Sequence, residues 1–235
     1  MVAATLPRLG VADLRLFKEE LSDENRIIAV AVAGLLPPEG GGVILDVGAG
    51  LGDIARRAFP QRRAILLDIL DFPPSPVAHH VRVHCDFFEY RHAGSEPIDL
   101  LLMSHVAQYL DDDLKRLHGQ LGALDPAYIM TVLNDDTGVY GRAIRWLRES
   151  GVESNPENPE LPIVPPNYLE ERSLGFEGKL RCSDFPSLAD QLGRVVLDAE
   201  LSDEVLGEFA RWLQINSENP TIEISQRVSR FARLK

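Results

Sequence analysis

Residues 43–53, VILDVGAGLGD, decide the fold: an apolar run contains an acid near its end and leads into three glycines spaced two apart. Where a buried strand leads through a glycine turn into a helix, backbone N–H groups and the helix dipole face a ligand at the carboxyl edge of the sheet. The segment that follows the glycines, DIARRAF, is the expected helix. We therefore predict a ligand site at the glycine turn.

The spacing and the charges around the glycines narrow the choice of ligand. Dinucleotide-binding loops usually carry a glycine where this chain has Asp53, and a GxxxxGK[ST] phosphate loop is excluded because no Lys-Ser or Lys-Thr follows. Asp46 stands two residues before Gly48, where it would repel a pyrophosphate but attract a ligand with an ammonium group and a sulfonium. Asp68 falls 20 residues after Gly48, where an acid commonly binds ribose hydroxyls.

The rest of the chain shows an alternation of strands and helices. Short, continuous apolar runs are typical of strands buried on both faces of a parallel sheet. They occupy residues 43–47, 64–68, 81–85, 98–103 and 128–133. Helices are expected within 11–36 after the N-cap Ser22 and over 111–124, 140–147, 183–192 and 202–213, with further strands over 194–199 and 221–231. This order predicts a doubly wound, mostly parallel seven-stranded sheet with helices on both faces.

The length of 235 residues suits one α/β domain. We divide it into an N-terminal helical cap (1–42), a cofactor-binding half (43–133) and a substrate-side half (134–235). Residues 151–172 contain five prolines between positions 156 and 166, which predicts an ordered loop or lid over a site. The alternative is a surface loop without a function.

Composition excludes several classes of partner. With 24 basic and 36 acidic residues, the net charge of −12 disfavours nucleic acid and anionic membrane surfaces. The most apolar segment, 27–36, is too short to span a bilayer, and no signal peptide is recognisable. Cys85 and Cys182 fit neither a disulfide framework nor a metal site. A cytoplasmic protein without a metal is expected, and the sequence does not indicate an oligomeric state.

Four short segments follow one another along the chain in the order VILDVGAGLGD, LLDIL, HCDFF and DLLLMSH. At these intervals they resemble successive motifs of S-adenosylmethionine (SAM)-dependent methyltransferases with the seven-stranded Rossmann-like (class I) fold. The likeness covers residues 43–133 and implies SAM as cofactor. It places the methionine part at Asp46, Gly48 and Gly50, the ribose at Asp68, the adenine at Asp86 and Phe87, and the sulfonium near Ser104 and His105, with Ala49 and Ile69 as further cofactor-binding residues.

Two residues after the fourth expected strand are candidates for chemistry. His105 would handle a proton or orient the acceptor, because a hydroxyl or ammonium acceptor must lose its proton before methylation. The alternative is a packed, hydrogen-bonded neighbour of the cofactor. Tyr109, one helical turn later, would line the acceptor pocket or anchor its helix on the sheet.

The substrate side offers four further candidates. Asn134 and Asp135 follow the fifth expected strand, where an acid would attract a cationic amine, although Asp135 or Asp136 could instead cap the next helix. Phe17 in the N-terminal segment and Tyr168 after the prolines could close the site as aromatic walls. Either could equally be a core residue.

The segment SHVAQYL stands where enzymes that methylate nucleic-acid bases carry a [DN]PP[YFW] motif. A small-molecule acceptor is therefore expected. SHVAQYLDD and the long tail from Ser183 more faintly resemble small-amine N-methyltransferases such as histamine N-methyltransferase, which favours nitrogen. The sequence thus predicts in-line methyl transfer from SAM to a small amine. The alternatives are a small-molecule O-methyltransferase, a non-catalytic SAM-fold partner module and a nucleotide-cofactor oxidoreductase.

Overall fold

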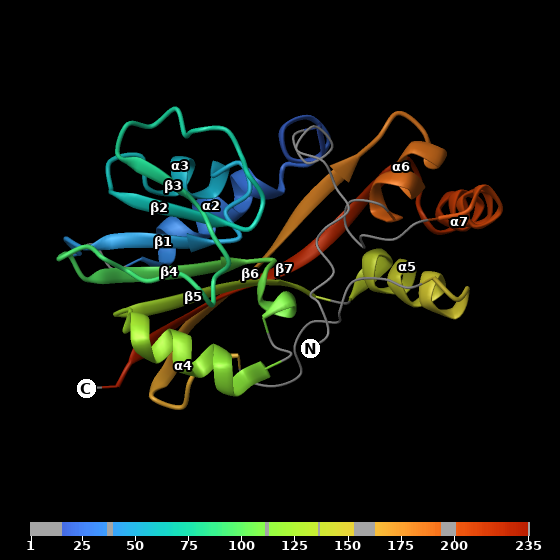
Figure 1. Cartoon of the computed structure of the whole chain (residues 1–235). Helices are drawn as coiled ribbons and strands as arrows, with labels where there is room; N and C mark the ends of the chain where they lie inside the picture. The colour runs from blue at the N-terminus through green and yellow to red at the C-terminus, as the bar shows by residue number, and fades with distance from the viewer. Residues whose placement is uncertain are drawn as a thin grey trace. The chain divides into compact units, whose positions relative to one another are not determined.

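The computed structural model describes residues 16–36, 40–110, 113–135, 137–152, 163–193 and 201–234. Among these residues, seven strands form one sheet in the order β3-β2-β1-β4-β5-β7-β6 (Figure 1). The strands are β1 (Val43–Val47), β2 (Ala64–Asp68), β3 (His80–His84), β4 (Ile98–Ser104), β5 (Tyr128–Asn134), β6 (Tyr168–Arg181) and β7 (Thr221–Arg233). The helices are α2 (Glu24–Leu35), α3 (Asp53–Ala58), α4 (Leu114–Leu124), α5 (Gly138–Glu149), α6 (Phe185–Gln191) and α7 (Asp203–Asn216).

The sheet is mixed. Strand β1 pairs in parallel with β2 and β4, and the same direction continues to β3 and β5. Strands β6 and β7 form an antiparallel hairpin at the other end of the order (Figure 1). The prediction of a seven-stranded α/β sheet is confirmed, with five parallel strands and the antiparallel pair β6 and β7. The helical cap over 1–42 and the proline-rich lid stay predictions.

The sixth strand corrects the sequence prediction. Residues 168–172, expected in the loop, begin the 14-residue strand β6. The predicted strand 194–199 lies outside the described residues, as does 153–162 of the predicted lid. Strand β6 escaped recognition because it is an edge strand whose exposed charged residues break the apolar pattern, namely Glu170, Glu171, Arg172 and Glu177. Charged residues on an edge strand oppose pairing with other chains.

The described residues form two compact units, which are treated separately below. The first, called the glycine-loop unit, contains residues 25–36, 40–110, 113–133, 163–175 and 227–234. The second, called the aromatic unit, contains residues 16–24, 134, 135, 137–152, 176–193 and 201–226. Strands β6 and β7 have residues in both. None of the described helices is long and apolar enough to cross a membrane.

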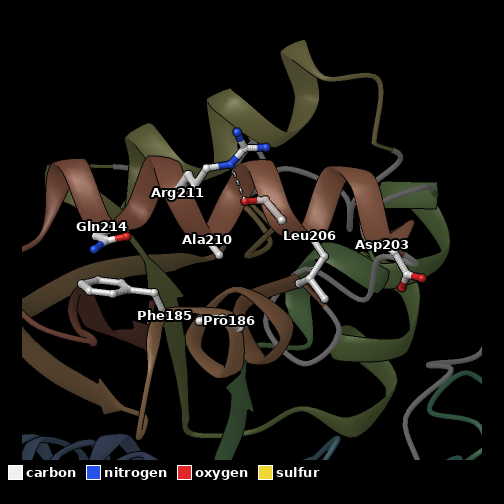
Figure 2. A pocket seen from close by; sticks show the side chains of 8 residues that line it. Phe185, Pro186, Asp203, Leu206, Ala210, Arg211 and Gln214 are labelled. Atoms are coloured by element: carbon white, nitrogen blue, oxygen red, sulfur yellow. Dashed lines mark hydrogen bonds between the residues drawn. The ribbon is translucent and has the colours of Figure 1, made fainter.

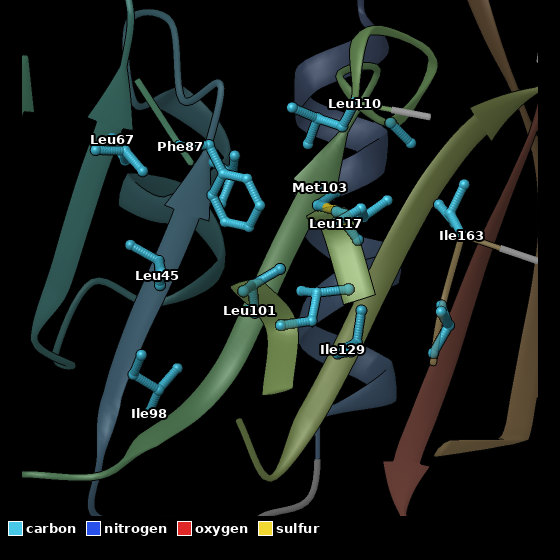
Figure 3. Close-up of a cluster of buried hydrophobic side chains, with 14 of the residues drawn as sticks. Leu45, Leu67, Phe87, Ile98, Leu101, Met103, Leu110, Leu117, Ile129 and Ile163 are labelled. Carbon is cyan, nitrogen blue, oxygen red and sulfur yellow. The ribbon is translucent and has the colours of Figure 1, made fainter. Parts of the chain in front are cut away.

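The core of the glycine-loop unit lies on both faces of its strands. On one face, Leu45, Leu101 and Met103 pack with Leu117 of α4 (Figure 3). Successive strand residues point to opposite faces, and the alternate positions are equally inaccessible: Ile44, Leu66, Leu100 and Leu102 are each 0% exposed. Helix α2 lies behind the sheet in Figure 3. Burial on both faces explains why these strands are continuous apolar runs in the sequence.

The core of the aromatic unit centres on α7. Phe209, which is 0% exposed, stacks on Trp146 of α5 with ring centroids 5.3 Å apart, and Trp212 lies 6.2 Å from Phe209. Apolar residues of β6 and β7, including Leu180 and Ile224, complete the cluster. Large aromatic surfaces thus stabilise this unit.

Helix starts follow the capping residues. Ser22 Oγ accepts a hydrogen bond (3.1 Å) from the N–H of Glu24, the first residue of α2. Asp113 caps α4 through the Arg116 N–H at 2.9 Å, and Ser202 caps α7. Each side chain satisfies an N–H that the helix leaves without a partner.

Candidate functional site

The glycine turn after β1 has a left-handed backbone at all three glycines. The φ angles are 66° at Gly48, 52° at Gly50 and 77° at Gly52. A Cβ on Gly48 would lie 2.8 Å from Val106 Cγ2, and one on Gly52 would lie 2.6 Å from Leu66 Cδ1, so a larger residue would clash. A Cβ on Gly50 would meet no described atom within 4 Å, which leaves the turn open above Gly50.

The peptide atoms of Gly50 are held by two charged side chains. Its N–H donates to Asp68 Oδ2 at 2.8 Å, and its carbonyl accepts from Arg82 Nη1 at 2.7 Å. Asp68 Oδ1 also accepts from the Leu70 N–H at 2.9 Å. Asp68 is therefore fixed at the end of β2, and it fixes the glycine turn in return.

Asp46 is a buried acid at the end of β1. It is 2% exposed, and burial raises its pKa from 3.8 to about 7. The negative charge of Asp68 raises the pKa further, whereas the guanidinium of Arg82 lowers it. Asp46 is thus a carboxyl group whose charge changes near neutral pH.

The segment after β4 lies against the glycine turn, because Val106 contacts Gly48. His105 has a φ of 53°, which is uncommon for a residue with a side chain, and its N–H donates to the Val132 carbonyl at 3.1 Å. Ser104 Oγ is buried and has no hydrogen-bond partner among the described residues. Strained backbone and an unused polar atom are typical of functional sites.

The predicted cofactor residue Ile69 follows β2, and the predicted adenine residues Asp86 and Phe87 follow β3. Asp86 Oδ1 accepts from the Phe88 N–H at 2.7 Å, and Ile69 is 41% exposed. The Phe87 ring is 5% exposed and packs in the core beside Leu45 (Figure 3). Contact between Phe87 and a ligand stays a prediction, for which this burial leaves little free surface.

Tyr168 does not reach the glycine turn. Its hydroxyl donates to the Pro126 carbonyl at 2.6 Å, it is 7% exposed, and burial raises its pKa to about 12. Pro126 precedes β5, whereas the carbonyl that holds His105 belongs to Val132 near the end of β5. At about 3.3 Å per strand residue, the first residue of β5 is roughly 13 Å from Val132. Tyr168 is therefore a core residue near the start of β5, whereas the glycine turn lies where the parallel strands end.

Asn134 belongs to a polar network within the aromatic unit. Its side-chain N–H donates to the Tyr140 hydroxyl at 2.9 Å, and its oxygen accepts from Gln226 at 3.1 Å. Gln226 also donates to Glu24, which is 4% exposed. Asp135 binds the Ser225 carbonyl through its backbone N–H at 2.7 Å.

Four residues named in the sequence analysis remain to be placed. Tyr109 ends the short 3-10 helix Ala107–Tyr109, and its N–H donates to the Val106 carbonyl at 3.0 Å. It therefore shares a short segment with His105. Ala49 is held in the glycine turn by a backbone hydrogen bond from its N–H to the Leu67 carbonyl at 3.1 Å. The side chain of Phe17 and the whole of Asp136 lie outside the described residues.

Arg82 is the site residue that the sequence interpretation missed. It lies in β3 between two valines, in the segment VRVHC. A lone charge inside an apolar strand is a usable signal, because burying a charge is costly unless it is paired.

Two cavities are found in the described part of the chain, and the glycine turn lines neither of them. One of 330 Å³ is lined by residues of α6 and α7, among them Phe185, Leu206 and Arg211 (Figure 2). The other, of 270 Å³, lies near the ends of α2 and α3. Neither contains a predicted site residue.

Comparison with known proteins gives matches among solved structures only. No protein-family model matches the sequence, and no curated protein does. A candidate methyltransferase from Bacillus halodurans C-125 is 10% identical over 88% of this chain and 97% of its own, with a TM-score of 0.55. A cyclopropane-fatty-acyl-phospholipid synthase-like protein from Lactobacillus casei ATCC 334 is 10% identical over 88% and 90% of the two chains, with a TM-score of 0.50. These likenesses establish the fold.

The chain has the class I methyltransferase fold. N-methyltransferase NodS from Bradyrhizobium japonicum WM9, solved with S-adenosyl-L-homocysteine (SAH), also matches, at 12% identity over 90% and 85% of the chains and a TM-score of 0.45. At such identities only the fold is transferred. The fainter resemblance to small-amine N-methyltransferases stays a prediction.

Proposed function

We propose that this protein transfers a methyl group from SAM to a small-molecule acceptor, with an amine nitrogen as the favoured atom. The observation that carries the proposal is the glycine turn of a class I methyltransferase fold, backed by the buried acid Asp46 and held by Asp68. A pyrophosphate would be repelled by this pair of acids, whereas the ammonium and sulfonium groups of SAM are complementary to them.

The residues present fit SAM. The open space above Gly50 allows close approach of a ligand to the backbone, and Ser104 Oγ has hydrogen-bonding capacity that no described group uses. Asp46 would hold the ammonium group, and Asp68 retains lone pairs for ribose hydroxyls beside its two backbone bonds. When bound, SAM supplies an electrophilic methyl group and its own leaving group.

His105 is the proposed proton-handling or acceptor-orienting residue. Its left-handed backbone and its bond to Val132 fix where the segment after β4 turns. Tyr109 follows in the same segment and is proposed to line the acceptor pocket. Methyl transfer depends mainly on holding the acceptor in line with the breaking bond, so both residues are proposed to act through placement.

The acceptor is proposed to be a cationic or neutral amine of low molecular weight. The net charge of −12 opposes a polyanionic acceptor, and Asn134 and Asp135 are the proposed amine-binding residues. An oxygen acceptor is the alternative. In the structure, the amide nitrogen of Asn134 donates to Tyr140 and its oxygen accepts from Gln226.

Calorimetric titration of the protein with SAM, SAH and NAD tests the cofactor. We expect binding of SAM and SAH and none of NAD. Tight NAD binding without SAM binding would overturn the proposal in favour of an oxidoreductase.

Turnover is tested separately by measuring SAH production across a panel of small amines and phenols. Product with amines supports the proposed acceptor, and product with phenols alone would replace it with an O-methyltransferase. SAM binding without product for any acceptor would instead indicate a non-catalytic partner module.

A further inference from the structure

Arg82 is an unusual residue for its position in the sheet. It lies in β3, pairs in register with Leu66 of β2, and is partly buried. Its Nη1 donates to the Gly50 carbonyl, and its guanidinium lies 5.4 Å from the centroid of the Phe72 ring. Its Nε is buried without a hydrogen-bond partner among the described residues. A cation is costly to bury in this way unless nearby charges compensate.

The compensating charges are the two acids of the proposed cofactor site. Burial lowers the pKa of Arg82, and the negative charges of Asp68, Asp46 and Asp71 oppose this effect and favour its charged form. In return, Arg82 opposes the mutual repulsion of Asp46 and Asp68. Two close carboxylates rarely ionise together without such a cation, and a guanidinium stays charged across the whole working pH range.

We propose that Arg82 is a positioning residue of the cofactor site, which braces the glycine turn through Gly50 and allows Asp46 and Asp68 to be negatively charged together. This inference rests on the proposed function, because the charged pair serves a cationic ligand. Arg82 itself points its Nη1 at the backbone and is not a catalytic residue.

Cofactor binding then depends on pH through Asp46. The charged groups that act on Asp46 are Asp68 from β2 and Arg82 from β3, and its register partners Leu66 and Leu102 are apolar. Ionised Asp46 attracts the ammonium group of the ligand, and protonated Asp46 does not. Affinity is therefore expected to rise with pH through neutrality and to fall as Asp46 takes up a proton.

The test measures SAH affinity by calorimetry from pH 5.5 to 8.5 in the full-length protein and in Arg82→Gln. The wild type should bind more tightly as pH rises, by up to about tenfold per pH unit below the Asp46 pKa. Arg82→Gln should weaken binding at pH 7 by about tenfold or more and move the midpoint to higher pH, because about one pKa unit corresponds to a tenfold change.

Two variants separate the effects of charge and contact. Arg82→Lys keeps the positive charge but loses the planar fork, so it should weaken binding with little change in the midpoint. Arg57→Gln removes an exposed arginine of α3 and serves as the matched control, with unchanged affinity and midpoint. An Arg82→Gln midpoint equal to that of the wild type would overturn the inference and leave the proposed function intact.

A measurement without ligand keeps the two proposals distinguishable. The pKa of the Asp46 carboxyl can be followed by carbon NMR in the free wild type and in Arg82→Gln, and we expect a higher value in the variant. Failure of the wild type to bind SAM or SAH would reject the proposed function, whereas an unchanged Asp46 pKa would reject the role of Arg82.

Circular dichroism shows whether Arg82→Gln folds. If it does not, SAH binding is compared across the same pH range in Arg82→Lys and Asp46→Asn. SAH binding that still depends on pH in Asp46→Asn would contradict the inference.

Discussion

The glycine-loop unit and the aromatic unit are stabilised in different ways. In the first, the site is defined by backbone conformation, with three left-handed glycines and charged side chains that bind peptide atoms. In the second, the dominant feature is the stack of Trp146, Phe209 and Trp212. A site defined by backbone and charge should respond mainly to changes of charge, and a core defined by aromatic volume should respond mainly to truncation.

The largest effect is expected in the aromatic unit. Phe209→Ala removes a ring that is 0% exposed and stacked on Trp146, and should lower the free energy of unfolding by about 3–5 kcal/mol. Denaturant unfolding measures the loss. Ile215→Ala in the same helix changes a side chain that is 83% exposed, so it should cost less than about 0.5 kcal/mol. Equal losses in the two variants would contradict the proposed role of the stack.

Asp46→Asn should stabilise the free protein above neutral pH. The folded pKa of Asp46 is about 7 and its ordinary value is 3.8, so the folded state holds a proton that the unfolded state has lost between these pH values. The free energy of unfolding of the wild type therefore falls as pH rises from the ordinary pKa of 3.8 to the folded pKa of about 7. At about 1.4 kcal/mol per pKa unit, the advantage of Asp46→Asn should grow by roughly 2–3 kcal/mol between pH 5 and 8.

Denaturant unfolding at the two pH values checks this gain, with the exposed Asp71→Asn as control. A constant difference between Asp46→Asn and the wild type would mean that Asp46 ionises normally. The same variant should bind SAM more weakly. The wild-type Asp46 would then lower the stability of the protein and raise its affinity for SAM.

Asp68→Ala should weaken SAM binding by about 1.5–3 kcal/mol, because it removes a charge-assisted hydrogen-bond acceptor. It also releases the Gly50 N–H, which Asp68 holds at 2.8 Å. Calorimetry measures the affinity, and Asp68→Asn, which keeps the shape and one acceptor oxygen, should lose less. Unchanged affinity in a folded Asp68→Ala variant would place the ribose elsewhere.

The smallest effect is expected at a helix terminus of the glycine-loop unit. Asp113→Ala removes the cap that accepts from the Arg116 N–H and should destabilise the protein by about 1 kcal/mol. Thermal unfolding measures the loss, and Asp113→Ser should recover most of it because serine also caps helices. A larger loss, shared by the serine variant, would point to a role of the charge beyond capping.

The sequence predicts the central strands well because their burial is two-sided. Strands β1 and β2 have the predicted bounds, and β4 begins at the predicted residue and extends one residue further. Their apolar runs end where the chain must turn, and the acid and glycines mark the same points. Local signals therefore suffice for the central sheet and for the position of the glycine turn.

The sequence does not predict features that depend on packing between distant parts of the chain. Tyr168 is a plausible aromatic wall by its place after the prolines, but its hydroxyl is bound at Pro126, 42 residues away. Strand β6 is exposed and charged, so its pairing with β7 leaves little trace in its own sequence. Arg82 becomes meaningful only through its contact with Gly50, 32 residues away. Each of these depends on long-range contacts that no local pattern contains.

The distribution of β6 and β7 over both units has a consequence during synthesis on the ribosome. Arg230 of β7 donates to the Leu35 carbonyl, 195 residues earlier, and its ion pair with Glu171 spans 59 residues. The nascent chain can form the parallel strands early, but these contacts arise only when β7 has left the exit tunnel. Contacts of such sequence separation slow folding and prolong the exposure of apolar surface. Completion of the glycine-loop unit therefore requires β7, and truncation within β7 should impair this unit as well as the aromatic one.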